Sequence, residues 1–175
     1  HPTKPGLKIP QMFEAAIDKE LKGVWIIGED IVQTDPNSAH VVEAMNSLEL
    51  LVVQEIFMSE TAKLATVVLP GTTFLEKDGT FTNTERRIQR VNQAVPPLPG
   101  TKTDGMIVTD MMQKLGFDQP TYDADQVLAE IADIVPFFKG VTRERLGKMG
   151  LQWPVQEDGT DTQILHKETF KLGKG

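Results

Sequence analysis

The sequence predicts an α/β domain built on a mainly parallel sheet. Three short apolar segments, at residues 23–27, 50–53 and 66–69, have the length and composition of buried strands. Helix-like segments separate them, and about 30 residues from the start of the first strand to the second is the usual length of a parallel crossover. Strands that are apolar on both sides indicate a sheet covered on both faces. We therefore expect a Rossmann-like, three-layer domain with helices on both faces of the sheet.

Local signals predict where the helices between these strands begin. Asp35 followed by Pro36 is typical of an N-cap and first helical position, and apolar residues at helical spacing follow over residues 41–48. Ser59 predicts the cap of a short helix over residues 61–64.

The pattern changes after residue 70. Asp78 and Gly79 predict a turn, and residues 81–91 an extended or hairpin segment. The Pro-rich residues 96–100 predict a stiff connector. A helix with Asp104 as its expected cap follows and stops at Gly116, and a second begins at about Asp125.

These signals divide the chain into a lead-in at residues 1–20, an α/β domain at residues 21–155 and a polar tail at residues 156–175. The net charge of −7 argues against a nucleic-acid surface, because such surfaces need clustered Lys and Arg. The apolar runs are far shorter than the roughly 20 residues of a membrane-spanning helix, so we expect no direct membrane insertion. The sequence does not determine the compartment, although a cytoplasmic location is slightly favoured.

Open α/β sheets bind ligands at the carboxyl ends of their strands, so the residues that follow each strand are the candidate binding residues. Gly28 would let a ligand approach the backbone, and Asp30 and Thr34 follow in the same loop. The alternative is that Gly28 only serves a turn and the two polar side chains only cap. Gln54 ends the second strand, where an amide could bind a ribose or a base edge, or simply be a solvated strand end. Gly71 follows the third strand.

Other chemistries find little support. The sequence has no G-x-G-x-x-G or Walker lysine motif. It also has no cysteine, which excludes disulfides, thiolate metal ligands and a cysteine nucleophile within these 175 residues. The charge-dense run at residues 76–90 could suggest a pair of catalytic carboxylates, but no histidine or nucleophile lies nearby. Ion pairs that fix a hairpin are the favoured interpretation, and Arg86, Arg87 and Arg90 could also bind phosphate or an acidic partner.

The run at residues 76–90, preceded by the apolar residues 66–70, resembles the signature of the molybdopterin oxidoreductases. Further motifs in the family's order extend the resemblance from about residue 21 to about residue 167, and within the family it is nearest to formate dehydrogenase alpha subunits. These motifs lie at residues 25–30, 33–36, 52–57, 61–65 and 102–104.

The resemblance implies a bis-pterin guanine dinucleotide cofactor (bis-MGD) with molybdenum or tungsten, one arm of which this domain would bind. It places cofactor contacts at Asp30, Thr34, Gln54, Gly71 and Asp104. A carboxylate such as that of Asp104 can accept two parallel hydrogen bonds from guanine, which adenine cannot supply. An N-cap role for Asp104 is the alternative.

Two positions depart from the family's pattern. Gly71 stands where relatives often have Ser, so only a backbone contact would remain there. Gly105 stands where the family usually has Trp, which removes packing beside the base.

The resemblance further implies that the intact enzyme oxidises formate to carbon dioxide. The iron–sulfur cluster, the metal ligand and the substrate-adjacent His and Arg would lie outside this chain, which alone should be inactive. The expected partners are the remaining domains of the same subunit and an electron-transfer subunit or redox protein. Two alternatives stay open: a cofactor-free structural domain of a respiratory-complex large subunit, and the same domain of a nitrate or other oxyanion reductase.

Overall fold

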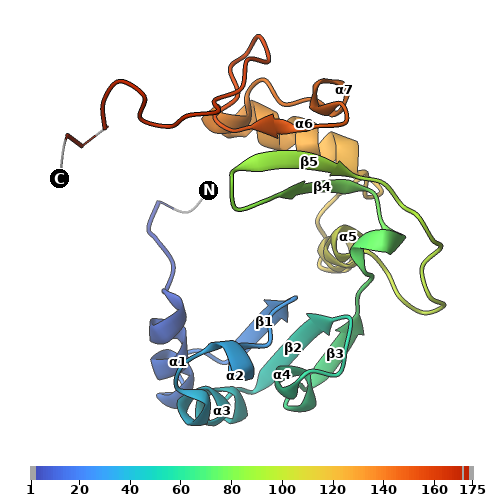
Figure 1. Ribbon diagram of the computed structural model, residues 1–175. Helices are drawn as coiled ribbons and strands as arrows, with labels where there is room; N and C mark the ends of the chain where they lie inside the picture. Colours follow the sequence, from blue (N-terminus) through green and yellow to red (C-terminus); the bar gives the residue numbers. More distant parts are fainter. Residues whose placement is uncertain (1–2, 171, 174–175) are drawn as a thin grey trace. The chain divides into compact units, whose positions relative to one another are not determined.

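The computed structural model describes residues 3–170 and 172–173, which fold as two compact units. The first unit contains the chain up to Thr73 together with Pro97–Met111, and the second contains Phe74–Pro96 together with the chain from Met112 onward. Figure 1 traces both units along the sequence. Each unit has its own sheet and its own buried apolar cluster.

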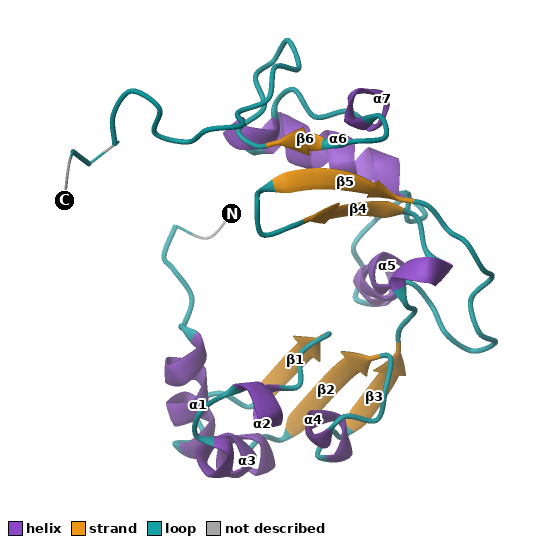
Figure 2. Cartoon of the chain, viewed as in Figure 1, coloured by secondary structure: helices purple, strands orange, loops and turns teal. Residues whose placement is uncertain are grey.

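The first unit is built on a three-stranded parallel sheet (Figure 2). Its strands, β1 (Gly23–Ile27), β2 (Leu50–Glu55) and β3 (Val67–Pro70), lie side by side in the order of the sequence. The predicted parallel sheet is therefore confirmed, with β2 as its central strand. In the register, Ile26 of β1 and Val68 of β3 both lie opposite Val53 of β2.

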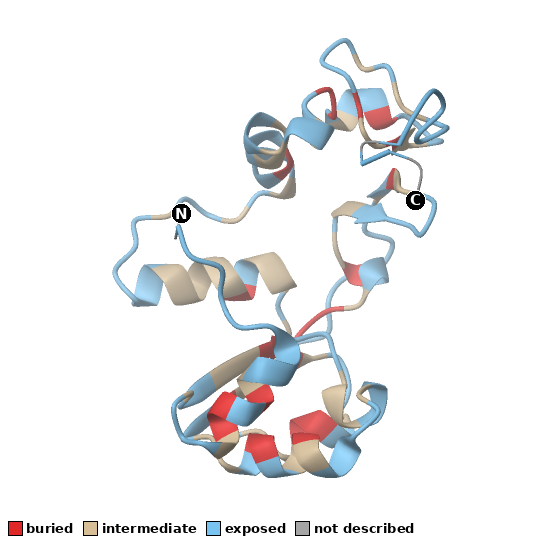
Figure 3. Cartoon of the chain, turned by 90° about the vertical axis from the view of Figure 1, so that its left-hand side faces the viewer, coloured by how far each residue is buried: buried red, intermediate tan, exposed pale blue. Residues whose placement is uncertain are grey.

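Four helices pack against one face of this sheet. They are α1 (Ile9–Ile17), α2 (Ile31–Thr34), α3 (Ser38–Asn46) and α4 (Glu60–Lys63). The buried cluster beneath them comprises Phe13, Ala16, Ile26, Val41, Ala44, Met45, Leu51, Val53 and Ala62. These residues come from three of the helices and from two strands, and Figure 3 shows the buried segments gathered there.

The opposite face of the sheet meets the start of α5 (Asp104–Lys114), which belongs to the first unit as far as Met111. Successive side chains of a strand point to opposite faces, so Gln54 lies on the face opposite Val53. The Gln54 side chain is hydrogen-bonded to Asp104, which places the first turn of α5 on this second face. The rest of the face carries half-exposed apolar side chains, among them Ile27, Leu50 and Val67.

The second unit is a small antiparallel sheet packed with short helices. The β4 strand (Gly79–Thr82) pairs with β5 (Arg87–Val91), and β5 pairs with the two-residue β6 (Leu151–Gln152). Its helical segments are η1 (Phe74–Glu76), α6 (Ala124–Ile134), η2 (Pro136–Phe138) and α7 (Arg143–Leu146). Its core comprises Ile88, Leu128, Val141, Leu146 and Val155.

The predicted hairpin at residues 81–91 is confirmed, and the chain reverses within that range. Asp78 and Gly79 precede and open β4, whereas the chain reverses at residues 83–86, where the Arg86 N–H donates to the carbonyl of Asn83. Arg86 adopts a left-handed backbone conformation with φ of 68°.

Two helix starts also differ from the sequence prediction. Helix α3 begins at Ser38 rather than after Asp35, because the side chain of Asn37 accepts from the N–H of His40 and supplies the cap. In α5, Thr103 takes the capping position: its carbonyl accepts from Ile107 and its hydroxyl from the N–H of Met106. The predicted cap at Ser59 is confirmed, since its hydroxyl accepts from the N–H of Ala62.

The predicted division into a lead-in, a domain and a tail stays a prediction. Within residues 1–20, helix α1 contributes Phe13 and Ala16 to the core of the first unit. Within residues 156–175, the described residues form no helix or strand, and residues 171, 174 and 175 lie outside the described part, as do residues 1 and 2. No helix in the described ranges is long and apolar enough to cross a membrane.

Because side chains alternate between the two faces along β2, truncating neighbouring residues should change the free energy of unfolding by very different amounts. Leu51 is 1% exposed, so Leu51→Ala should lower the free energy of unfolding of the first unit by about 2–5 kcal/mol. Leu50 is 46% exposed, and Leu50→Ala should change it by about 0.5 kcal/mol or less. Urea unfolding followed by Trp25 fluorescence in a Trp153→Phe background would measure both. Equal losses for the two variants would contradict the register.

Candidate functional site

The structure brings three of the six predicted site residues together at the carboxyl ends of β2 and β3. Gln54 is the last residue but one of β2, Gly71 directly follows β3, and Asp104 is the first residue of α5. The Nε2 atom of Gln54 donates a 2.8 Å hydrogen bond to Oδ1 of Asp104. A Cβ atom at Gly71 would lie 3.3 Å from the same Oδ1. Gly71 thus allows the carboxylate to approach the end of β3 closely.

Gln54 is almost completely enclosed, with 1% of its surface exposed. Its amide oxygen, Oε1, has no hydrogen-bond partner among the described residues. The alternative of a solvated strand end is therefore wrong. Among the described residues, the hydrogen-bond partner of this side chain is Asp104.

Asp104 is half-buried at the start of α5, and it does not cap that helix, because Thr103 does. Its carboxylate lies in the first turn, where the positive end of the helix dipole favours a negative charge. The carboxylate is thus held by a strand residue on one side and approached closely by a glycine on the other.

Asp30 is held instead by the start of α4. Its Oδ1 accepts from the N–H and the hydroxyl of Thr61, at 3.0 and 2.6 Å, and its Oδ2 accepts from the N–H of Glu60 and from the amide of Gln33. Burial of the carboxyl raises its pKa, but these hydrogen bonds outweigh burial and lower the pKa below its ordinary value of 3.8. The carboxylate links the loop after β1 to α4.

Gly28 and Thr34 lie on either side of this loop. Gly28 has a left-handed backbone, with φ of +63° and open space where a side chain would be, and its N–H donates to the carbonyl of Gln54. Gly28 therefore serves the turn and also leaves the end of β1 open. The hydroxyl of Thr34 donates to Oε1 of Glu29 at 2.7 Å.

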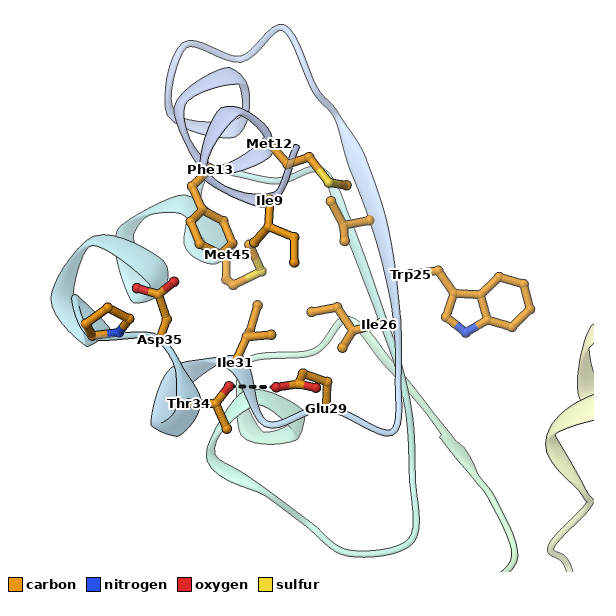
Figure 4. Close-up of a pocket in the computed structure, with 12 residues that line it drawn as sticks. Ile9, Met12, Phe13, Trp25, Ile26, Glu29, Ile31, Thr34, Asp35 and Met45 are labelled. Carbon is orange, nitrogen blue, oxygen red and sulfur yellow. Dashed lines mark hydrogen bonds between the residues drawn. The ribbon is translucent and has the colours of Figure 1, made fainter. Parts of the chain in front are cut away.

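The Thr34–Glu29 pair lies at the rim of an apolar groove of about 440 Å³ (Figure 4). Phe13 of α1, Ile26 of β1 and Met45 of α3 line it. These three side chains belong to the core of the first unit. The groove is thus an open side of the core, and it lies on the sheet face opposite Gln54 and Asp104.

Two threonines outside the set of predicted site residues contribute to this edge of the sheet. Thr61 is fully buried, and its hydroxyl accepts from the N–H of Val32 while donating to Asp30. Thr72 is 2% exposed, and its hydroxyl has no partner among the described residues. Its place directly after Gly71, at the end of β3, is a signal that the sequence did offer.

The charged run at residues 76–90 forms internal contacts of the second unit. Arg86 donates to the backbone carbonyls of Trp153, Thr162 and Gln163. Hydrogen bonds and charge from Arg87 lower the pKa of Glu85. Among the described residues, no group of three or more His, Asp or Glu side chains could hold a metal ion.

Comparison with known proteins identifies the family. The model of the molybdopterin oxidoreductases matches residues 1–114, which is more than half of the chain. The chain belongs to the molybdopterin oxidoreductase family. This family implies a molybdopterin cofactor with molybdenum or tungsten.

Curated relatives resemble the chain over nearly all of its length. The alpha subunit of an F420-dependent formate dehydrogenase from Methanocaldococcus jannaschii is 43% identical over 97% of this chain, which spans 26% of that protein. A Bacillus subtilis protein named as an oxidoreductase is 42% identical over 99% of the chain, which spans 18% of it. The chain thus covers about a fifth to a quarter of the length of these relatives.

Among solved structures, acetylene hydratase from Pelobacter acetylenicus is similar in fold. The match has a TM-score of 0.55 and 22% sequence identity, and it covers 60% of this chain and 15% of that enzyme. It supports the α/β fold.

The hydrogen bonds to Asp30 predict a pH-dependent contribution to stability. Because the folded-state pKa is lowered, the contribution is present above the ordinary pKa of 3.8 and is lost as the pH falls through the folded-state value. Asp30→Asn should therefore be less stable than the wild type at neutral pH, and the difference should shrink from about pH 5 to about pH 2. Urea unfolding across this range would measure it, with the exposed Asp18→Asn as control. A difference that does not change with pH would contradict this role.

Proposed function

We propose that this chain is the part of a molybdenum or tungsten formate dehydrogenase that binds one guanine dinucleotide arm of the bis-pterin cofactor. One observation carries the proposal. The carboxylate of Asp104 is fixed at the carboxyl ends of β2 and β3, the edge at which open α/β sheets bind ligands.

A carboxylate at this edge suits guanine in particular. Guanine offers two adjacent donors, N1–H and the 2-amino group, and a carboxylate can accept both in parallel. Adenine lacks this pair of donors. By analogy with bidentate contacts to bases elsewhere, the preference is worth about 1–3 kcal/mol. Asp104 is thus the proposed reader of the base.

The surrounding residues fit a nucleotide arm. The hydroxyl of Thr72, directly after Gly71, has no partner within the described chain, so this edge contains a polar group that the unit itself does not satisfy. The absence of a side chain at Gly71 leaves room beside Asp104, and Gly28 leaves open space at the end of β1.

For the whole enzyme, a relative named formate dehydrogenase at 43% identity supports formate as the substrate. The bound cofactor would supply two-electron redox chemistry at its metal, while this chain binds and orients one of its arms. The iron–sulfur cluster would lie outside the chain. The partners would be the remaining domains of the subunit and an electron-transfer subunit or redox protein.

If binding is the chain's share of the reaction, the 175 residues alone should not oxidise formate. They contain no cysteine to ligate the metal or a cluster. The purified chain should give no turnover with formate and an artificial electron acceptor, with or without added cofactor. Reproducible turnover in a preparation free of other enzymes would contradict the proposal.

The base preference should depend on Asp104. We expect the chain to bind GDP at about millimolar dissociation constant, because one chain provides only part of the pocket. GDP should bind more tightly than ADP, and Asp104→Ala should abolish the preference. Chemical-shift titration would measure both nucleotides.

Asp110→Ala is the matched control, since Asp110 lies on the same helix and pairs with Lys102. It should leave the preference unchanged. Equal binding of GDP and ADP by the wild type, or a guanine preference that survives Asp104→Ala, would overturn the assignment of Asp104.

A further inference from the structure

The environment of Gln54 is unusual for a ligand-binding amide. The residue is 1% exposed, and its Oε1 atom is enclosed by protein without a donor. A buried polar atom without a partner destabilises the fold, and an apolar side chain of similar size would avoid that loss. Direct contact between this side chain and a ligand would require the surrounding chain to move. The Gln54 amide can therefore influence the site through its hydrogen bond to Asp104.

That hydrogen bond fixes the orientation of a carboxylate. Asp104 lies in the first turn of α5, and its capping alternative is removed because Thr103 supplies the cap. The contacts of the carboxylate limit its rotation about its own side-chain bonds. The Nε2 atom of Gln54 restricts that rotation by holding Oδ1 at 2.8 Å.

Gly71 restricts the carboxylate from the other side. Its backbone is pinned to the end of β2, since its N–H donates to the carbonyl of Glu55 at 3.0 Å. A Cβ atom at this position would be 3.3 Å from Oδ1 of Asp104, which is closer than ordinary van der Waals contact. The glycine thus lets Oδ1 approach both strands, and the Gln54 amide holds it there.

We propose that Gln54 is a positioning residue that sets the base specificity of this site by orienting the carboxylate of Asp104, without touching the ligand. The inference rests on the proposed function, in which Asp104 reads a guanine base. It further predicts that the oriented carboxylate accepts from both guanine donors together. A carboxylate that Gln54 no longer holds at Oδ1 would lose the second of these bonds first.

Three nucleotides separate these possibilities. GDP offers N1–H and the 2-amino group, IDP offers N1–H alone, and ADP offers neither in this arrangement. The wild-type chain should prefer GDP to IDP as well as to ADP. In Gln54→Leu the preference for GDP over IDP should fall by about 5- to 150-fold, the loss of one well-placed pair, while the affinity for ADP stays unchanged. Dissociation constants from chemical-shift titration of the full chain provide the ratio.

Gln33→Leu is the matched control. It also removes a glutamine amide from a carboxylate, that of Asp30, but on an exposed side chain away from Asp104. It should leave the GDP-to-IDP ratio unchanged. In an Asp104→Ala background, Gln54→Leu should have no further effect on the ratio, because Gln54 acts through that carboxylate. An independent effect in that background would overturn the inference.

The remaining outcomes distinguish the two proposals. If the wild type binds GDP, IDP and ADP equally, the proposed function fails. If the wild type prefers GDP and Gln54→Leu retains the full preference over IDP, Asp104 remains the reader and the role of Gln54 is wrong. Circular dichroism would show whether Gln54→Leu folds. If it does not, Gln54→Asn replaces it, because its amide is one methylene too short to hold Asp104. The same loss of preference for GDP over IDP is expected for that variant.

Discussion

The first unit depends on the pairing of β2 with a parallel strand on each side. The register aligns Val53 of β2 with Ile26 and Val68, and this places Leu51 and Val53 in the core. A shift of one residue would exchange the two faces, bringing the Gln54 amide into the apolar cluster and Val53 out of it. The core therefore fixes which face carries Gln54. Through the hydrogen bond to Asp104, it also places the first turn of α5 on that face.

The polar residues at the strand ends are held in the same way, by hydrogen bonds within the unit. All four contacts of the Asp30 carboxylate come from nearby protein groups, two of them from Thr61. They join the loop after β1 to the start of α4. Such a loop presents Gly28 to its surroundings in a fixed geometry, which reduces the conformational entropy that a ligand would have to remove. A structural role for Asp30 and a binding role for the loop are thus compatible.

The sequence predicted those parts of the fold that depend on local pattern. The three parallel strands followed from short apolar segments, and the cap at Ser59 from one residue and its neighbours. The starts of α3 and α5 were misplaced because several capping residues occur together there, and propensity does not choose between Asp35 and Asn37 or between Thr103 and Asp104. The contact of Gln54 with Asp104 joins positions 50 residues apart, so no local pattern could reveal it.

The charged run that first indicated the family has a different physical role from the candidate site. Arg86, in a left-handed backbone conformation, directs its guanidinium at the carbonyls of Trp153, Thr162 and Gln163, and lies 5.8 Å from the ring centroid of Trp153. Loop carbonyls outside a sheet need such donors, and the five N–H groups of arginine can satisfy several at once. The run thus stabilises the second unit, whereas the case for a bound guanine rests on the first. A protein could share the run, and with it the fold, and still differ at Asp104. For this reason base preference at that carboxylate, rather than the signature itself, is the test of cofactor binding.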